Sequence, residues 1–119
     1  IRLNVPLHIL PTWYYPDDAS WQSYETKSDL MIVSPDQNPN RELVMGEIRK
    51  AFPKMSVIII QGLKYENYLE LERRAKWSLT FGEGLDGYFY GPTLRGGVAF
   101  AVRNGTFDLS GFEDLTCPL

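Results

Sequence analysis

Short apolar runs that alternate with helix-like stretches constrain the fold of this chain more than any other feature. The runs that resemble strands are Leu30–Val33, Val57–Ile60, Lys76–Phe81 and Val98–Val102. Strands that alternate with helices of about ten residues form right-handed β-α-β units and therefore a parallel sheet with helices on both faces. We therefore predict a Rossmann-like three-layer α/β sandwich with a parallel sheet of four or slightly more strands.

Three helices are predicted between these strands. The first starts at Asn38-Pro39, a capping residue followed by a proline that the first helical turn tolerates. Its predicted inner face is Leu43, Val44, Ile48, Ala51 and Phe52. The second helix is Tyr65–Ala75, with Tyr68, Leu71 and Ala75 on the inner side and Glu66, Glu70, Arg73 and Arg74 on the outer side. The third is a short helix near Tyr88–Arg95 that Gly96-Gly97 ends.

Length and charge limit the class of protein. A chain of 119 residues is expected to form one domain with a real core. Its net charge of −3 and pI of about 5.1 argue against a nucleic-acid partner. The one cysteine, Cys117, cannot form an internal disulfide, and no apolar run is long enough for a transmembrane helix. Because the chain starts without a methionine or a signal peptide, we expect a cytoplasmic fragment of a longer protein.

Residues 1–28 differ in composition from residues 29–119, which hold the predicted α/β domain. Pro6, Pro11 and Pro16 exclude a regular helix, and Trp13-Tyr14-Tyr15 forms an aromatic cluster. These aromatic residues are either a stacking platform for a ligand or a surface that packs on this domain or on a neighbouring one.

A glycine-rich turn is the most informative site in the sequence. Ligands of parallel sheets bind at the carboxyl ends of the strands, so the relevant loops are Ser34–Asn38, Gln61–Lys64, Gly82–Gly87 and Arg103–Phe107. In the third loop Gly82, Gly84 and Gly87 let a ligand approach the bare backbone closely. The free amide groups at the start of the next helix can hold a phosphate or diphosphate. The spacing matches neither a dinucleotide fingerprint nor a P-loop. A tight turn with nothing bound is the alternative.

Two carboxylates, Glu83 and Asp86, lie between these glycines. They are placed to accept hydrogen bonds from sugar hydroxyls or to do acid-base chemistry; alternatively they only cap the next helix. Other candidates are weaker. His8 is the only histidine, so no zinc cluster is indicated, and a pair of His8 with a serine or with Cys117 is the one option for nucleophilic chemistry; a structural role for His8 is the expectation. The arginines Arg41, Arg73, Arg74 and Arg95 are expected mostly on a solvated helical surface, with Arg41 near enough to the first loop to contact a phosphate.

The stretch from Tyr65 to Val102 resembles the carboxyl-terminal, nucleotide-sugar-binding half of a GT-B-fold glycosyltransferase. In that family a helix and a strand lead into a Glu-Gly turn, a short helix, a glycine turn and another strand. Here the matching glycine positions are Glu83-Gly84 and Gly96-Gly97. The sequence departs from the family at Gly91, where the family carries a second glutamate that holds the ribose.

The resemblance implies a sugar-nucleotide donor and a glycan or lipid-linked acceptor, with no metal and no cofactor. Glu83 would face the donor sugar as the catalytic residue, and Gln61-Gly62-Leu63 would lie beside the base. The diphosphate would lie on backbone amides of the turn and the helix start; the implied binding residues there are Gly82, Gly84, Asp86, Gly87 and Tyr88. Catalysis would need a missing amino-terminal domain, so this part of the protein would be inactive alone. It would be cytoplasmic and would lie near a membrane only through its parent protein.

Two alternatives stay open. One is a non-catalytic α/β interaction domain that keeps the fold without a working site, consistent with Gly91. The other is a small phosphate-binding, flavodoxin-like regulatory domain. It is disfavoured because Ser34 and Asp36, not a pair of acids, follow the first strand.

Overall fold

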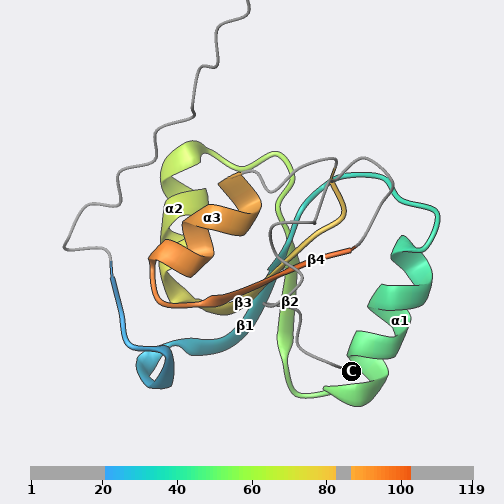
Figure 1. Cartoon of the computed structure of the whole chain (residues 1–119), viewed down its shortest axis with the longest axis horizontal. Helices are drawn as coiled ribbons and strands as arrows, with labels where there is room; N and C mark the ends of the chain where they lie inside the picture. The colour runs from blue at the N-terminus through green and yellow to red at the C-terminus, as the bar shows by residue number, and fades with distance from the viewer. Residues whose placement is uncertain (1–20, 83–86, 103–119) are drawn as a thin grey trace, which may run out of the picture.

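The computed structural model describes residues 21–82 and 87–102, which form a four-stranded parallel sheet (Figure 1). The strands are β1 (Ser28–Val33), β2 (Ser56–Ile59), β3 (Ala75–Thr80) and β4 (Val98–Ala101), in the order β2-β1-β3-β4. Every neighbouring pair is parallel. The predicted α/β fold with an all-parallel sheet is confirmed.

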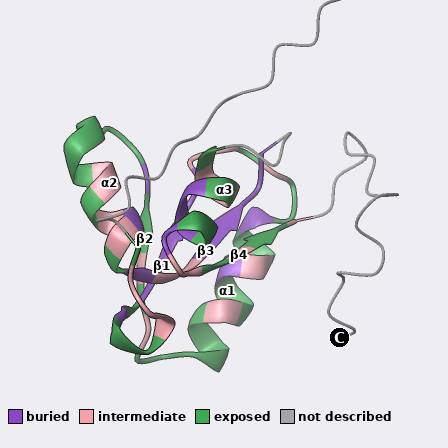
Figure 2. Ribbon diagram, turned by 60° about the vertical axis from the view of Figure 1, so that its left-hand side comes forward, coloured by how far each residue is buried: buried purple, intermediate pink, exposed green. Residues whose placement is uncertain are grey.

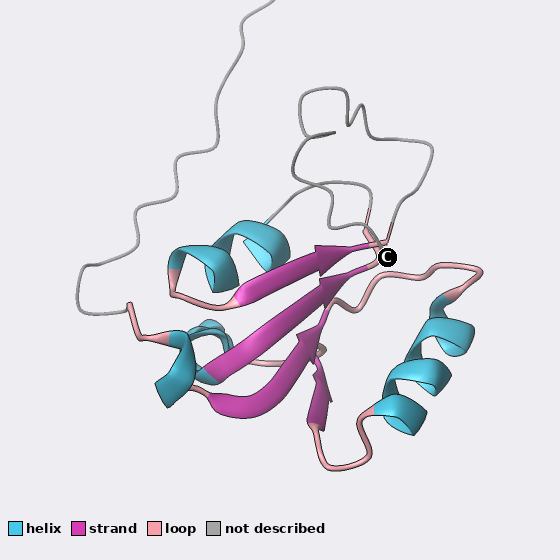
Figure 3. Cartoon of the chain, turned by 60° about the horizontal axis from the view of Figure 1, so that its bottom comes forward, coloured by secondary structure: helices cyan, strands magenta, loops and turns pink. Residues whose placement is uncertain are grey.

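Helices cover both faces of the sheet. Helix α1 (Arg41–Ala51) lies on one face, and α2 (Tyr65–Arg74) and α3 (Gly87–Leu94) lie together on the other (Figure 1; Figure 3). The chain moves from β1 outward to β2 and then back past β1 to β3. Because parallel crossovers are right-handed, this reversal places α1 and α2 on opposite faces. It also creates a switch point between β1 and β3, the usual ligand position in such sheets.

Two apolar clusters form the core, one on each face of the sheet. The cluster on the α1 face is Met31, Val33, Met45, Leu79 and Phe81. The cluster on the α2–α3 face is Leu30, Ile32, Ile60 and Ala75, with Tyr68, Leu71 and Tyr88 packed against it. Successive residues of β1 alternate between the two clusters, which explains why its sequence is an unbroken apolar run. Burial is concentrated in the central strands (Figure 2).

The start of α1 differs from the prediction. The helix begins at Arg41 with Asn40 as its cap, and Asn38-Pro39 lies in the preceding turn. The Asn38 side chain accepts a hydrogen bond from the Asn40 backbone N–H at 2.9 Å, and the Asn38 carbonyl accepts one from the Arg41 N–H at 3.0 Å. Asn38 therefore closes a turn that precedes the helix instead of capping the helix itself.

The inner face of α1 is also rotated from the predicted one. Met45 is buried, and Val44 and Ile48 pack against the same cluster. Leu43 and Phe52, which were predicted to face inward, are 68% and 60% exposed. Residues 41, 44, 45 and 48 share one helical side, and the buried Arg41 belongs to it. The prediction was wrong because it counted only apolar residues and so excluded the arginine that fixes this side.

The remaining boundaries lie within about two residues of the predicted ones, the usual uncertainty of element ends; the largest difference is at β1, which begins at Ser28 and not at Leu30. Helix α2 passes directly into β3, because Ala75 already has extended backbone angles. Upstream, a short 3₁₀ helix (η2, Tyr24–Thr26) precedes β1. Within residues 21–82 and 87–102, none of the helices is long and apolar enough to cross a membrane.

Candidate ligand site at the carboxyl edge of the sheet

The loop after β1 is fixed against the end of β3, at the switch point. The Ser34 backbone N–H donates to the Leu79 carbonyl at 2.9 Å, and the Ser34 hydroxyl oxygen accepts from the Phe81 N–H at 3.0 Å. The Arg41 guanidinium donates to the carbonyls of Ser34 and Asp36, both at 2.8 Å, and lies 4.9 Å from the centre of the Phe81 ring. Arg41 was predicted on a solvated surface near a phosphate; it is instead buried and holds the loop backbone.

Gly82 opens the glycine-rich turn in direct contact with this loop. A Cβ at Gly82 would lie 2.7 Å from Oδ2 of Asp36, so a side chain here would displace the carboxylate. The Gly82 N–H donates to the Thr80 hydroxyl at 3.2 Å. Within the described residues, Asp36 Oδ2 is buried without a hydrogen-bond partner. The first glycine of the turn thus accommodates the chain's own carboxylate; Glu83, Gly84 and Asp86 lie outside the described residues.

A hollow of about 330 Å³ lies on the α2–α3 side of the same edge. Its lining comes from the loops after β1 and β2 and from the first turns of α2 and α3. The lining residues are Pro35, Ile60, Gln61, Gly62, Leu63, Tyr65, Tyr68 and Tyr88. Gly62 has a φ of +66°, a backbone conformation that other residues adopt only with strain, so this glycine lets the loop turn sharply at the rim.

Three tyrosines give this hollow its chemical character. The Tyr68 and Tyr88 rings meet edge to face, with centroids 5.7 Å apart and planes at 74°. The Tyr65 ring lies 6.3 Å from Tyr68 and is 66% exposed, at the mouth of the hollow. Aromatic rings that are partly exposed and held by neighbouring rings offer flat apolar surface for stacking. The hollow is therefore suited to a planar ring.

An ion pair between α2 and Arg95, the residue directly after α3, lies next to Tyr68 of the hollow. The Arg95 guanidinium donates to the Glu72 carboxylate at 2.6 Å, and Glu72 is 1% exposed. The Tyr68 hydroxyl donates to the same carboxylate at 2.7 Å and lies 3.3 Å from the carbonyl of Gly87, the first residue of α3. Arg95, predicted on a solvated surface, is instead a buried partner in this network.

Glu72 also fills the space beside Gly91. A Cβ at Gly91 would collide with Oε1 of Glu72, and Gly91 is buried in α3. The position where the resembling family carries its ribose glutamate therefore has no room for a side chain. The nearest carboxylate there belongs to Glu72 and is already paired with Arg95.

Lys27 adds a second buried cation near this network. Its ammonium group donates to the Arg73 carbonyl at 2.5 Å. Burial, and then repulsion from Arg95 and Arg73, lowers the pKa of Lys27 below its usual value, while Glu72 opposes the shift. Positive charge thus collects at the carboxyl-terminal end of α2, where a helix dipole favours it.

The structure brings part of the predicted site together. One hollow is lined both by the consecutive residues Gln61, Gly62 and Leu63 and by Tyr88, which lies far from them in the sequence. Gly87 begins α3 next to it. The hollow also contains Tyr65 and Tyr68, which the sequence prediction did not assign to the site. Their three-residue spacing directly after the Gln61–Lys64 loop was an available indication, since such a pair shares one side of a helix.

No group of three or more metal-ligating side chains occurs among the residues that the structure describes. His8 and Cys117 lie outside that part of the chain. No family model, curated protein or solved structure matches the chain.

Proposed function

We propose that this chain is the donor-binding half of a glycosyltransferase and binds a sugar nucleotide at the carboxyl edge of its sheet. The observation that carries the proposal is the tyrosine-lined hollow formed by Gln61–Leu63, Tyr65 and Tyr88, next to the glycine-rich turn. Hollows with flat aromatic walls and a few polar groups are typical small-molecule sites, and this one lies where parallel sheets bind ligands.

In this proposal the base stacks against the tyrosines, and the diphosphate lies towards the start of α3. Tyr65 supplies the accessible ring, and Gln61 supplies amide hydrogen-bonding groups at the rim. The first N–H groups of a helix have no partner within the helix and favour negative charge, and α3 begins at Gly87. Gly84 and Asp86 would line the diphosphate path, and Glu83 would face the donor sugar.

The proposed reaction transfers a sugar from the nucleotide to a glycan or a lipid-linked acceptor. Glu83 would act at the sugar, while helix amides would stabilise the leaving diphosphate without a metal ion. The acceptor and the rest of the catalytic cleft would come from an amino-terminal domain of the parent protein. This half would therefore bind donor without turnover, in the cytoplasm, and would approach a membrane only through that parent protein.

A second candidate function is a non-catalytic interaction domain. The contact between Glu72 and Gly91 favours it, because a donor ribose would find no carboxylate at that position of α3. In this alternative the fold is retained and the hollow binds no nucleotide.

Thermal denaturation with UDP, GDP, ADP and CDP, each with and without an attached sugar, tests the proposal. A ligand at 100 times its Kd adds about 2.7 kcal/mol, and each 1 kcal/mol raises the Tm of a domain this size by about 4–8 °C. We expect a shift selective for one nucleotide, larger when the sugar is attached. No shift at millimolar concentration of any of them would favour the interaction domain.

A matched pair of variants makes the test specific to the hollow. Tyr65→Ala should weaken nucleotide binding by roughly tenfold, because stacking of a base on an aromatic ring contributes about 1–3 kcal/mol. Tyr90→Ala is the control, since Tyr90 is also an exposed tyrosine but lies outside the hollow. Glu83→Ala should reduce the additional effect of the sugar and leave nucleotide binding intact. Equal effects of Tyr65→Ala and Tyr90→Ala would contradict the proposed site.

A further inference from the structure

The half of the α1 face formed by β3 and β4 exposes apolar side chains. Val98 pairs with Trp77 in the sheet register, and Phe100 pairs with Leu79. Because paired residues of parallel strands point to the same face, Val98 and Phe100 lie on the side of Leu79, which belongs to the α1-side core. Val98 is 44% exposed and Phe100 is 49% exposed.

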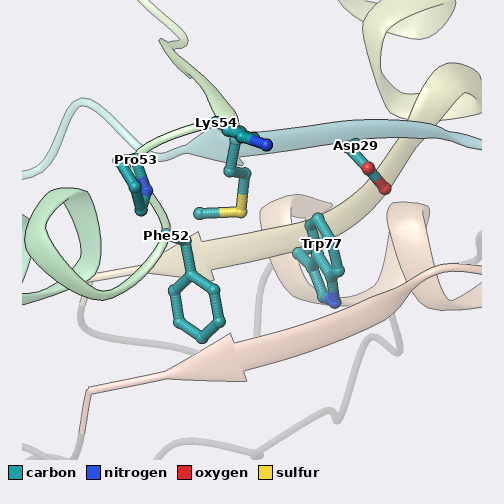
Figure 4. Close-up of a pocket in the computed structure, with 6 residues that line it drawn as sticks. Asp29, Phe52, Pro53, Lys54 and Trp77 are labelled. Carbon is teal, nitrogen blue, oxygen red and sulfur yellow. The ribbon is translucent and has the colours of Figure 1, made fainter.

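A second hollow, of about 250 Å³, adjoins these residues. It is lined by Asp29, Phe52, Pro53, Lys54, Met55 and Trp77 (Figure 4). The rings of Phe52 and Trp77 flank it, and Phe52 is 60% exposed. We call the combined surface of Phe52, Met55, Trp77, Val98 and Phe100 the open face.

The opposite side of the same strands is covered. Helix α3 contacts both β3 and β4, and α2 contacts β1. On the open side α1 is the only described helix, and its inward residues pack against the cluster of Met31, Val33, Leu79 and Phe81. Strands of parallel sheets are normally covered on both faces, and adjacent exposed apolar residues mark a contact surface. The open face therefore indicates a segment or partner that packs there.

Residues 103–119 are the segment best placed to do so. They continue directly from the carboxyl end of β4, whose four residues extend about 13 Å at 3.3 Å per residue. A segment of 17 residues spans about 25 Å even when helical, which is enough to return along the whole open face. The chain before Trp21 instead joins the fold at the other end of β4, where the Gln22 N–H donates to the Arg95 carbonyl at 3.2 Å.

The sequence of residues 103–119 is complementary to the open face. Leu109, Phe112 and Leu115 recur every three residues, a spacing that places them on one side of a helix.

Charge adds a second element of complementarity. Residues 103–119 contain three acids, Asp108, Glu113 and Asp114, and one base, Arg103. Lys54 and Asp29 line the hollow beside the open face, and Asp29 is already paired with Lys76 at 2.6 Å, which leaves Lys54 as the basic group there. An acidic amphipathic segment would bury its apolar side on Phe100 and Trp77 and place its acids near this lysine.

We propose that residues 103–119 return across the α1 face of the sheet and pack on the open face, with Leu109, Phe112 and Leu115 against Trp77, Val98 and Phe100. This inference does not depend on nucleotide binding.

The lone cysteine allows a direct test in the full chain. A nitroxide spin label on Cys117 should weaken the amide NMR signals of Trp77, Val98 and Phe100. The signals of Gln61 and Leu63, at the hollow on the other side of the sheet, should keep their intensity. Phe112→Asp should abolish the weakening, because a carboxylate would replace the central apolar residue. Thr116→Asp, a matched change at a polar position, should preserve it.

Each other outcome would overturn the proposal. Unchanged intensities at Trp77, Val98 and Phe100 in the labelled chain would mean that another segment or a separate partner occupies the open face. A ¹⁵N-labelled chain mixed with an unlabelled, spin-labelled chain distinguishes a second copy: weakening in that mixture at the same residues would show contact between molecules. Persistence of the effect in Phe112→Asp would exclude apolar packing as its cause.

Discussion

The two faces of this sheet are completed in different ways. On the α2–α3 face, two helices, a ring cluster and the Glu72–Arg95 ion pair cover the central strands. On the α1 face, one helix covers an aliphatic and aromatic cluster around Met45, while Val98 and Phe100 stay partly exposed. The same strands thus have one face organised around a buried ion pair and one organised mainly by apolar packing, with Arg41 as its buried charge.

This difference assigns different roles to the faces. A buried ion pair with its hydrogen bonds requires one arrangement of its partners, so α2 and α3 are held in a single relative position beneath the tyrosine hollow. Apolar packing tolerates more variation in shape. We therefore expect the α2–α3 face to be more sensitive to substitution than the α1 face.

The largest expected effect comes from breaking the buried ion pair. Glu72→Ala should lower the free energy of unfolding by about 3–5 kcal/mol, because it leaves the buried Arg95 guanidinium without this carboxylate. Urea unfolding measures the change. The double variant Glu72→Met/Arg95→Met should recover much of the loss, since it removes both charges. If the double variant is as unstable as Glu72→Ala, packing and not charge explains the effect.

Truncation of the core residue on the other face should have a similar or smaller effect. Met45→Ala should lower the free energy of unfolding by about 2–5 kcal/mol, because Met45 is 2% exposed and its removal leaves a cavity. Leu43→Ala on the same helix is the control and should change it by less than about 0.5 kcal/mol, since Leu43 is 68% exposed. Equal losses would contradict the observed orientation of α1.

Filling the space at Gly91 tests the polar face without removing a charge. Gly91→Ala should destabilise the fold by about 1–3 kcal/mol, because the added methyl group displaces the Glu72 carboxylate. Gly46→Ala is the matched control within α1, where nothing lies near the added Cβ. This control should stabilise by about 0.5–1 kcal/mol through helix propensity. A neutral Gly91→Ala would show that Glu72 relaxes easily.

The smallest effect concerns pH. Burial lowers the pKa of Lys27 in the folded state, so the unfolded chain binds more protons at pH values between that lowered pKa and the ordinary lysine pKa of 10.5. Stability contributed by Lys27 therefore rises with pH through this window. The difference in unfolding free energy between the wild type and Lys27→Met should increase from neutral to alkaline pH in parallel urea titrations. A constant difference would show that Lys27 titrates alike in both states.

Sequence patterns were sufficient where local burial decided the structure. The apolar runs at Leu30–Val33 and Val57–Ile60 correctly predicted parallel strands, and the loop Gln61–Leu63 was placed at the carboxyl edge. Burial on both faces was wrong for the second run, because β2 is an edge strand in which Ile58 and Ile59 are 36% and 40% exposed. Apart from the cap and the inner face of α1, the errors occurred at charged residues. Arg41 and Arg95 were predicted on the surface, but both are buried. Their hydrogen-bond acceptors come from other elements: the carbonyls of Ser34 and Asp36 for Arg41, and the Glu72 carboxylate for Arg95.

The sequence by itself determined the strands, the parallel topology and the edge of the sheet at which the Gln61–Leu63 loop lies, because hydrophobic periodicity and crossover handedness are local properties of the chain. Only the tertiary structure decided that Tyr65, Tyr68 and Tyr88 share one hollow. It also decided that Glu72 forms an ion pair with Arg95 and lies against Gly91. The contacts of Glu72 with Gly91 and Arg95 join residues about 20 positions apart in the sequence. A charge such as that of Glu72 is stable inside the protein only when another element supplies an opposite charge beside it. The position of that partner is a property of the folded chain.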